Sequence, residues 1–314
     1  MSAQSVEEST HPVVPVLPRV SVVICTYNRS ALVREVVESA LADPTTHEVV
    51  VADDGSSDDT VEVLQGLAES ESRLVVVPLG SNQGRNVARQ RGVETATGEI
   101  VLLLDDDVVP GPDIARKHAE HHVRERDAVV VGFMPVRTTE ATNITSRIYA
   151  QEYLGRIAKY EQDSANVLEN LWGGHCSLPR AAALATSVNA TGFENYYHQD
   201  RDFGLRCRAN GMHGVFDRHL VSEHRHTRSL DAFLKDANRR GKGLSLLRDR
   251  HGEIAMDPAP PIALLGRPQV LPLARTATAP LRRLGGRPLV LSVKLLRRLA
   301  TWQGAEEYRR SIAG

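Results

Sequence analysis

Three adjacent carboxylates end a strongly apolar segment in the first half of the chain. Asp105, Asp106 and Asp107 directly follow the sequence Val-Leu-Leu-Leu at positions 101–104. Such a run predicts a buried strand whose carboxyl end carries negative charge to the rim of an open sheet, where α/β folds bind ligands. Because like charges repel, neighbouring carboxylates persist most readily beside a divalent cation. The pattern therefore predicts a site for a metal ion and a diphosphate.

A second acidic segment, Asp-Asp-Gly-Ser-Ser-Asp-Asp-Thr at positions 53–60, lies between a predicted strand and a predicted helix. A carboxylate there can accept an N–H of a base, while backbone amides and the start of the helix favour a ligand phosphate. The same residue types also form ordinary turns and helix N-caps. Taken alone, the segment is more often a cap and turn than a binding site, but its position on the same edge as the triple aspartate favours binding.

The elements that must position these groups alternate along the first half of the chain. Short apolar runs predict strands at residues 20–25, 48–52, 74–78 and 100–104, and helical spacing predicts helices at 30–41, 60–69 and 84–95. This alternation predicts an α/β fold, with a mostly parallel, twisted sheet and helices on both faces. Polar residues follow three of the strands, so we expect them to converge on one edge.

The second half of the chain is less regular. Helical patterns cover residues 143–170, 180–186 and 199–210, and Trp172-Gly-Gly predicts a turn between the first two. After about Asp257 the composition shifts to Pro, Leu and Arg, which predicts a basic amphipathic tail over 257–314, in segments of roughly a dozen residues. A helical appendage with solvated arginines and a membrane-contacting tail explain this composition equally well.

Overall composition narrows the class of protein. The formal net charge is −1 over 314 residues, which predicts no nucleic-acid partner. The three cysteines, Cys25, Cys176 and Cys207, are odd in number and far apart, which argues against a disulfide framework and for a reducing compartment. Residues 1–19 are polar and contain no apolar signal core. We expect a cytoplasmic protein with a flexible leader, at the inner face of the membrane if the tail makes that contact.

Taken together, the motifs resemble the family 2 glycosyltransferases, which are nucleotide-sugar-dependent enzymes of the GT-A fold. The resemblance extends from Val20 to Gly243, and its strength lies in the order of several motifs that are individually weak. These motifs are SVVICTYNR (21–29), VADDGSSDDT (51–60), NQGRNVAR (82–89), LDDD (104–107), GGHCSLPR (173–180), GFE (192–194) and QDRDF (199–203), with Arg206 and Gly211.

The resemblance implies roles on the donor side of the site. Thr26, with its neighbour Tyr27, and Asp54 match residues that hold the nucleobase, and Asp54 would accept the uracil N3–H, which favours a UDP-sugar. Asp53 is the less certain member of its pair. Arg89 matches a basic residue near the ribose and the diphosphate, although a surface arginine in a salt bridge explains its position equally well.

The resemblance also implies a metal site and a catalytic base. Asp105 would lie near the ribose and a metal-bound water, Asp107 would ligate Mn²⁺ or Mg²⁺, and Asp106 is the intervening residue. Asp200 matches the general base of the family. Gln199 stands where relatives have Glu, which leaves Asp202 as a second candidate for the base.

Histidines and an aromatic residue complete the candidate site. His224 aligns best with a histidine that completes the metal shell in some relatives, with His226 second, and a solvated histidine-rich turn is the alternative. Trp172, Gly174 and His175, with Gln199, are candidate sugar or acceptor contacts, and ordinary packing explains them as well. Three further histidines lack carboxylate partners and are expected to face solvent; they are His118, His121 and His122.

The resulting hypothesis is an inverting, metal-dependent glycosyltransferase of the EC 2.4 class. Residues 20–130 would form the nucleotide-sugar-binding half of one GT-A domain, and 131–256 the acceptor-binding and catalytic half. The acceptor stays open among a natural-product scaffold, a glycan and a lipid-linked molecule. Two alternatives are a nucleotidyltransferase, which would need a Gly-rich, arginine-containing loop after the first strand, and a non-catalytic nucleotide-sugar-binding or membrane-peripheral protein, which would have no use for Asp200.

Overall fold

The computed structural model describes residues 16–139, 142–189, 192, 197–225, 227–252 and 262–313. Most of the predicted leader, His226 and positions 193–194 lie outside this part of the chain. The strands are β1 (Val20–Thr26), β2 (Thr46–Asp53), β3 (Leu74–Pro78), β4 (Ile100–Asp105), β5 (Val108–Pro110), β6 (Ala128–Phe133), β7 (His175–Pro179) and β8 (His213–His224). The helices of the α/β domain are α1 (Ser30–Leu41), α2 (Thr60–Ser70), α3 (Arg85–Thr95), α4 (Ile114–Arg124), α5 (Ile144–Gln162), α6 (Ala165–Glu169), α7 (Arg180–Thr186) and α8 (Gln199–Ala209).

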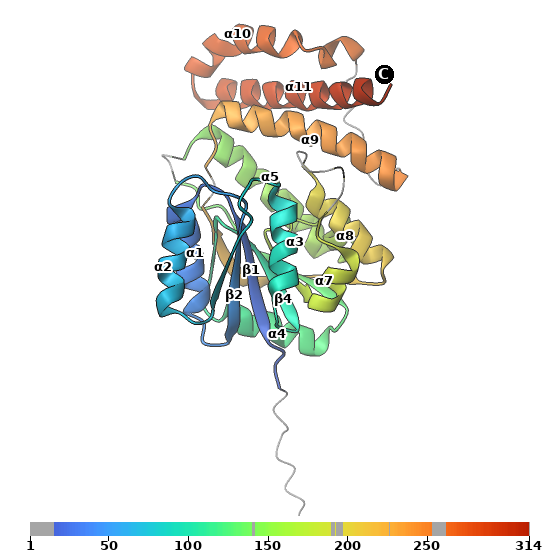
Figure 1. The fold of residues 1–314 in the computed structure, drawn as a ribbon. Helices are drawn as coiled ribbons and strands as arrows, with labels where there is room; N and C mark the ends of the chain where they lie inside the picture. The colour runs from blue at the N-terminus through green and yellow to red at the C-terminus, as the bar shows by residue number, and fades with distance from the viewer. Residues whose placement is uncertain are drawn as a thin grey trace, which may run out of the picture.

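One mixed sheet of eight strands organises the molecule, in the order β3-β2-β1-β4-β7-β6-β8-β5 (Figure 1). The strands β3, β2, β1 and β4 are parallel, as the alternating pattern predicts. β7 pairs antiparallel with both β4 and β6, which makes the second half of the sheet mixed. The predicted α/β fold with a mostly parallel sheet is confirmed.

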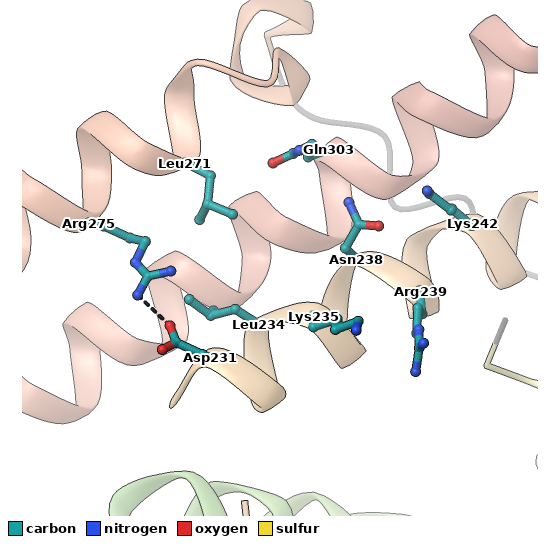
Figure 2. A pocket seen from close by; sticks show the side chains of 9 residues that line it. All are labelled: Asp231, Leu234, Lys235, Asn238, Arg239, Lys242, Leu271, Arg275 and Gln303. Carbon is teal, nitrogen blue, oxygen red and sulfur yellow. Dashed lines mark hydrogen bonds and ion pairs between the residues drawn. The ribbon is translucent and has the colours of Figure 1, made fainter. Parts of the chain in front are cut away.

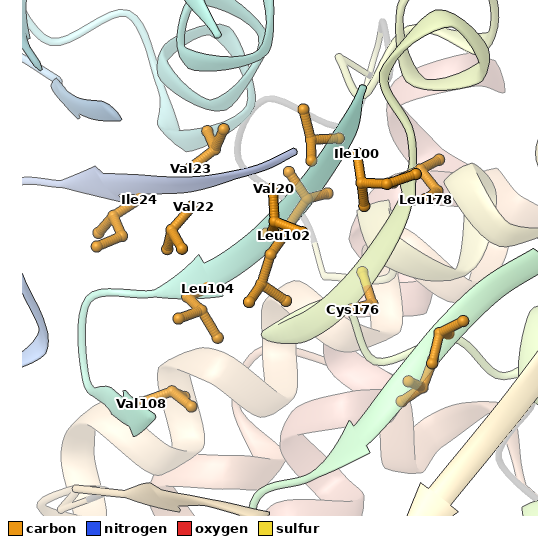
Figure 3. Close-up of a cluster of buried hydrophobic side chains, with 14 of the residues drawn as sticks. Val20, Val22, Val23, Ile24, Ile100, Leu102, Leu104, Val108, Cys176 and Leu178 are labelled. Atoms are coloured by element: carbon orange, nitrogen blue, oxygen red, sulfur yellow. The ribbon is translucent and has the colours of Figure 1, made fainter. Parts of the chain in front are cut away.

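The sheet core explains why the first strands are continuously apolar. All seven residues of β1 are buried, and side chains from both faces of β1 and β4 lie in one hydrophobic cluster (Figure 3). A parallel strand covered by helices on both sides exposes neither face to water, so both faces are apolar. Gly92 of α3 lies so close to β1 that an added Cβ would be 2.5 Å from Val23, which fixes how closely α3 packs on the sheet.

Two predictions needed correction. The pattern over 143–170 forms two helices, α5 and α6, because the helix begun at the Asn143 cap ends at Asp163, which adopts an extended backbone conformation. The expectation that the histidines of 118–122 face solvent was wrong. His118 and His122 are buried, because they share one face of the unpredicted helix α4 with its apolar residues, and His121 is largely buried against Asp217.

A layer of helices covers one end of the sheet (Figure 1). It consists of α9 (Leu230–His251), the short 3₁₀ segment η2 (Ala263–Gly266), α10 (Val270–Arg283) and α11 (Gly286–Ala313). Leu234 and Ala237 of α9 pack against Leu296 and Ala300 of α11. The tail is therefore helical as expected, but α11 has 28 residues where segments of about a dozen were predicted. Over the described residues, no helix combines the length and apolar character needed to cross a bilayer.

Candidate functional site

The register of the parallel strands brings the predicted polar residues to one edge of the sheet. Thr26 at the end of β1 is paired with Asp53 at the end of β2, and Cys25 is paired with Asp105 at the end of β4. The carboxyl ends of these strands point toward the side of the molecule on which α9, α10 and α11 lie (Figure 1). This is the edge at which open α/β sheets bind ligands.

Arginine side chains balance the negative charge of the three adjacent carboxylates. Arg29 donates to Asp106 at 2.8 Å and to Asp107 at 2.9 Å, and Thr26 Oγ1 donates to Asp106 at 2.9 Å. Arg89 donates to Asp105 at 2.6 Å. The acidic run predicts carboxylates balanced by a divalent cation, whereas each of the three has an arginine partner within the chain.

The two buried members of the trio have opposite pKa shifts. Burial is the largest effect on Asp106 and raises the pKa of its carboxyl to about 6. Burial also acts to raise the pKa of Asp107, but the hydrogen bond and charge of His224, together with Arg29, bring it well below the ordinary value. His224 Nε2 lies 3.3 Å from Asp107 Oδ1. Asp107 therefore stays ionised, whereas Asp106 takes up a proton as the pH falls toward 6.

Asp200, at the start of α8, joins the same cluster through two arginines of α3. Arg89 donates to Asp200 at 3.2 Å, and Arg85 lies 3.5 Å from both Asp105 and Asp200. The backbone N–H of Gly173 donates to the other carboxylate oxygen at 3.1 Å. Burial acts to raise the pKa of Asp200, but Arg85, Arg89 and this amide lower it overall, so the carboxylate is ionised at neutral pH.

Asp202, the second candidate for the base, has a different environment. Its side chain is fully buried and pairs with Arg206 at 2.7 Å, Arg250 at 3.1 Å and His251 at 2.8 Å. These contacts tie α8 to the end of α9. Asp202 is therefore enclosed by ion pairs that hold α8 and α9 together. The geometry favours Asp200 as the residue that faces the site.

Both aspartates after β2 are buried and hold loop backbones in place. Asp53 accepts the N–H groups of Gly55 at 3.1 Å and Ser56 at 2.9 Å, as in an ordinary turn. Asp54 accepts those of Gln83 at 2.7 Å and Gly84 at 3.0 Å. A carboxylate has about four acceptor positions, so Asp54 can take a further donor. Burial is the main cause that raises the pKa of Asp54.

The candidate sugar and acceptor contacts separate into two groups, of which all but His175 form the first. An added Cβ at Gly174 would lie 2.7 Å from Asp105 Oδ2, so this glycine borders the carboxylate cluster. Trp172 packs edge-on against Tyr149, with ring centroids 5.2 Å apart, and Tyr149 in turn contacts His224. Gln199 precedes Asp200 at the start of α8, and Tyr27 is exposed beside β1.

His175 lies apart from this cluster. Its ring is fully buried, and Nε2 lies 3.0 Å from His118 Nε2. Ser177 Oγ contacts both His118 and His122 on the same side of β7. Burial lowers the pKa of His175 to about 3 and that of His122 to about 4, so these rings are neutral. The structure brings His175 together with the α4 histidines instead of with the site edge.

The chemistry of the donor set fits a divalent cation only in part. Asp107 and His224 converge with an oxygen and a nitrogen ligand, which suits Mn²⁺ and, less well, Mg²⁺. Within the described ranges, no group of three or more His, Cys, Asp and Glu side chains is placed to hold a metal ion by itself. A cation would therefore take its remaining ligands from a bound diphosphate and water.

A hollow of about 440 Å³ lies elsewhere, between α9, α10 and α11 (Figure 2). None of the residues that line it belongs to the carboxylate cluster. The chemistry predicted from the sequence therefore belongs to the sheet edge and not to this hollow.

Comparison with known proteins identifies the family. Residues 21–186 match the profile described as Glycosyl transferase family 2. The chain belongs to this family. A curated member, the GalNAc(5)-diNAcBac-PP-undecaprenol beta-1,3-glucosyltransferase of Campylobacter jejuni, is 38% identical over 94 residues, which are 29% of this chain. The chain thus spans only 30% of the length of that relative.

Solved structures share the GT-A-like fold of this family 2 chain. A mannosyltransferase from Pyrobaculum calidifontis, in complex with GDP-Man and Mn²⁺, superimposes with a TM-score of 0.60 at 19% identity, over 93% of this chain and 87% of the other. TarS 1-349 of S. aureus, in complex with UDP, gives a TM-score of 0.56 at 16% identity, over 93% of this chain and 92% of the other.

Two arginines of this family 2 chain were not among the predicted site residues. Arg29 is the last residue of the TYNR segment (26–29), which begins at the end of β1. Arg85 lies one helical turn before Arg89. The spacing of Arg85 and Arg89 by four residues places both on the same face of a helix, which is a signal that the sequence contains. The partner carboxylates of Arg29 are 77 and 78 positions away, so only the folded chain shows that contact.

Proposed function

We propose that the protein transfers a sugar from a nucleotide diphosphate donor to an acceptor hydroxyl, with inversion at the anomeric carbon. The observation that carries this proposal is the bridge made by Arg89, which contacts Asp105 at the donor edge and Asp200 at the start of α8. The bridge holds a candidate donor-side residue and a candidate base in one cluster. Family 2 membership supports the reaction class.

For the donor we propose a UDP-sugar, bound by residues 20–130 of the domain. Thr26 and Asp54 would contact the base, with Tyr27 and Asp53 beside it, and Asp54 retains acceptor capacity for the uracil N3–H. A UDP complex exists for the S. aureus structure and a GDP-Man complex for the archaeal one. Calorimetric titration with UDP and GDP in parallel tests the choice, since stronger binding of GDP would contradict it.

For the metal we propose Mn²⁺ or Mg²⁺, held by Asp107 and His224. When bound, the cation supplies positive charge that stabilises the departing diphosphate. The chain's own contribution is to keep Asp107 ionised, through the ion pair with Arg29. Arg85 and Arg89 add fixed positive charge beside Asp105, on the side where the resemblance places the ribose and diphosphate.

For the base we propose Asp200, which would accept the proton of the acceptor hydroxyl as that oxygen attacks the anomeric carbon. A single displacement of this kind inverts the configuration. The low pKa of Asp200 keeps it ionised, and the Gly173 amide fixes the orientation of its carboxylate. Residues 131–256 would form the acceptor side, with Trp172, Gly174 and Gln199 near the acceptor.

For the acceptor we propose a lipid-linked molecule. The relative from Campylobacter jejuni is named for a polyprenyl-diphosphate-linked glycan, and it supports this class of acceptor.

Release of UDP from a panel of UDP-sugars, with and without Mn²⁺, tests the overall proposal. Metal-dependent release that increases with a lipid-linked acceptor is expected. The absence of release and of calorimetric donor binding with every nucleotide sugar would contradict transferase activity.

A further inference from the structure

The C-terminal helices have a charge distribution unlike the rest of the chain. Residues 262–305 contain eight Lys and Arg residues and no Asp or Glu, whereas the whole protein has a formal net charge of −1. The excess of positive charge is therefore local and is offset by acidic residues elsewhere. Such asymmetry creates a local positive potential that a balanced total conceals.

α10 has two apolar faces, and only one of them packs against the protein. Leu271, Ala274 and Thr278 face the other helices: Leu271 and Ala274 join the cluster of α9 and α11, and Thr278 is buried. The opposite face of the helix is exposed and uncharged. Its residues are Leu273, Thr276, Ala277, Pro280 and Leu281, continued by Leu284 after the helix. A helix that is apolar on the solvent side as well needs a second apolar environment.

Exposed leucines also lie on the first turns of α11. Leu273, Leu284 and Leu291 are 69%, 72% and 67% exposed, and Leu281 and Leu295 are also exposed. In Figure 1, α10 is the outermost helix of the molecule, and α11 lies between it and α9. We call the surface formed by these five leucines the outer leucine surface. Exposed leucines gathered on two neighbouring helices mark a contact site.

Basic side chains border the outer leucine surface. Arg283, Arg287 and Lys294 are exposed, and within the described part of the chain no carboxylate lies at ion-pair distance from any of them. By contrast, Arg275 and Arg297, which point toward the protein, pair with Asp231 and Glu152. The inward arginines thus have acidic partners within the protein, and the outward cations face solvent.

From this arrangement we infer that α10 and the start of α11 bind the surface of an anionic lipid bilayer, with the outer leucine surface at the headgroup boundary. Leucines would enter the upper acyl region while the long basic side chains reach lipid phosphates. Charge of one sign surrounding an uncharged strip matches an anionic membrane. A second copy of this chain would instead bring like charges together.

The position of the outer leucine surface relative to the site extends the proposed function, and this part of the inference rests on that function. The donor edge of the sheet points toward the helical layer that carries the outer leucine surface (Figure 1). Membrane binding would therefore bring the site close to a lipid-linked acceptor. The binding itself is a separate property and can be measured without any nucleotide sugar.

Co-sedimentation of the full chain with vesicles tests the inference. Vesicles of phosphatidylcholine alone are compared with vesicles containing about a third phosphatidylglycerol. We expect binding to the anionic vesicles that weakens with salt, and little binding to the neutral ones. The variant Arg283→Gln/Arg287→Gln/Lys294→Gln should lose at least about tenfold in partitioning, since each surface cation contributes to attraction.

Two further variants separate membrane binding from other effects. Arg34→Gln/Arg91→Gln/Arg126→Gln removes the same charge from exposed positions of the α/β domain and should bind vesicles like the parent. Leu273→Ser/Leu281→Ser/Leu284→Ser should lose binding while calorimetric binding of UDP stays unchanged. Equal loss in both charge variants would contradict the inference. The inference would also be contradicted if light scattering showed a dimer without lipid and the serine variant were a monomer.

The outcome is independent of the transferase proposal. Vesicle binding without UDP release would uphold the lipid contact and contradict the enzymatic function. UDP release without vesicle binding would uphold the enzymatic function and contradict the lipid contact.

Discussion

Arg89 of α3 and Asp105 of β4 form an ion pair with a distance of 2.6 Å, and the arginine side chain is only 4% exposed. A buried arginine needs carboxylate partners because the cost of removing its charge from water is large. Arg89 finds the second partner in Asp200. The two segments that carry the proposed donor contact and the proposed base, 95 positions apart, are thus tied together by one side chain.

Replacement of the proposed base should separate chemistry from binding. Asp200→Asn keeps the shape of the side chain but cannot accept the acceptor proton, so we expect transfer to fall by about 10²- to 10⁴-fold. Calorimetric affinity for UDP should change little. In contrast, Asp202→Asn removes the buried carboxylate that pairs with Arg206, Arg250 and His251, and it should lower the free energy of unfolding by about 1.5–3 kcal/mol. Normal turnover by Asp200→Asn would remove Asp200 from the mechanism.

The pH dependence of transfer should report the arginines around Asp200. The pKa of this carboxyl is below the ordinary value, so a base of this kind stays active as the pH falls, and the rate drops only when the carboxyl takes up a proton. Arg85→Gln removes one of the charges that lower the pKa. We expect the acidic limb of kcat/KM, measured from pH 3 to 8, to move to higher pH in this variant. Arg91→Gln, an exposed arginine on the same helix, should leave the limb in place.

Arg29 holds the carboxylates that a divalent cation would approach. Arg29→Gln removes a positive charge that contacts Asp106 and Asp107, so Mn²⁺ should bind the chain about tenfold more tightly at pH 8, in the absence of nucleotide. Titration calorimetry measures this directly, and Arg34→Gln on the outer side of α1 is the control. Weaker Mn²⁺ binding in Arg29→Gln would mean that Arg29 supports the metal site instead of competing for it.

Gly174 should tolerate no side chain. The Cβ of Gly174→Ala would lie 2.7 Å from Asp105 Oδ2 and 3.2 Å from Met134 Cε, which forces the carboxylate away from Arg89. We expect weaker donor binding and reduced transfer. Gly155→Ala in α5 is a matched control, because nothing lies within 4 Å of its Cβ, and it should increase helix stability by about 0.5–1 kcal/mol. Equal donor affinity in both variants would show that Asp105 is not constrained by Gly174.

Acid should destabilise the fold through the histidines between α4 and β7. The pKa of His122 is lowered to about 4 and that of His175 to about 3, mainly by burial, while an unfolded chain protonates both near pH 6.5. The unfolded state then binds more protons, so stability is highest above pH 6.5 and falls as the pH decreases. For His122 the loss at pH 5 is about 2 kcal/mol as an upper bound. Urea unfolding at pH 7 and 5 measures it.

A variant assigns the acid sensitivity to a single ring. His122→Gln should reduce the difference in stability between pH 7 and pH 5, whereas His47→Gln, at an exposed histidine near Thr97, should not. An unchanged difference in His122→Gln would contradict the assignment.

Much of the fold could be predicted because the first half of the chain is locally consistent. The strands β1, β2 and β4 each contain a continuous apolar run, and turn residues follow each of them, so the hydrophobic pattern and the turn residues predict the same elements. Helix α4, by contrast, was not predicted, and it buries polar residues. His118 and His122 were misjudged for that reason, since a histidine on a helix gives no local sign that Ser177 and His175 will surround it.

The sequence by itself determined which polar residues end each parallel strand, and therefore that Thr26, Asp53 and Asp105 meet at one edge. Strand register follows from local periodicity, and parallel strands end on the same side. Only the tertiary structure decided how the charges at that edge are balanced. Arg29, Arg85 and Arg89 reach carboxylates that are remote in sequence, and the energies of such pairs depend on distance and burial, which no local pattern encodes.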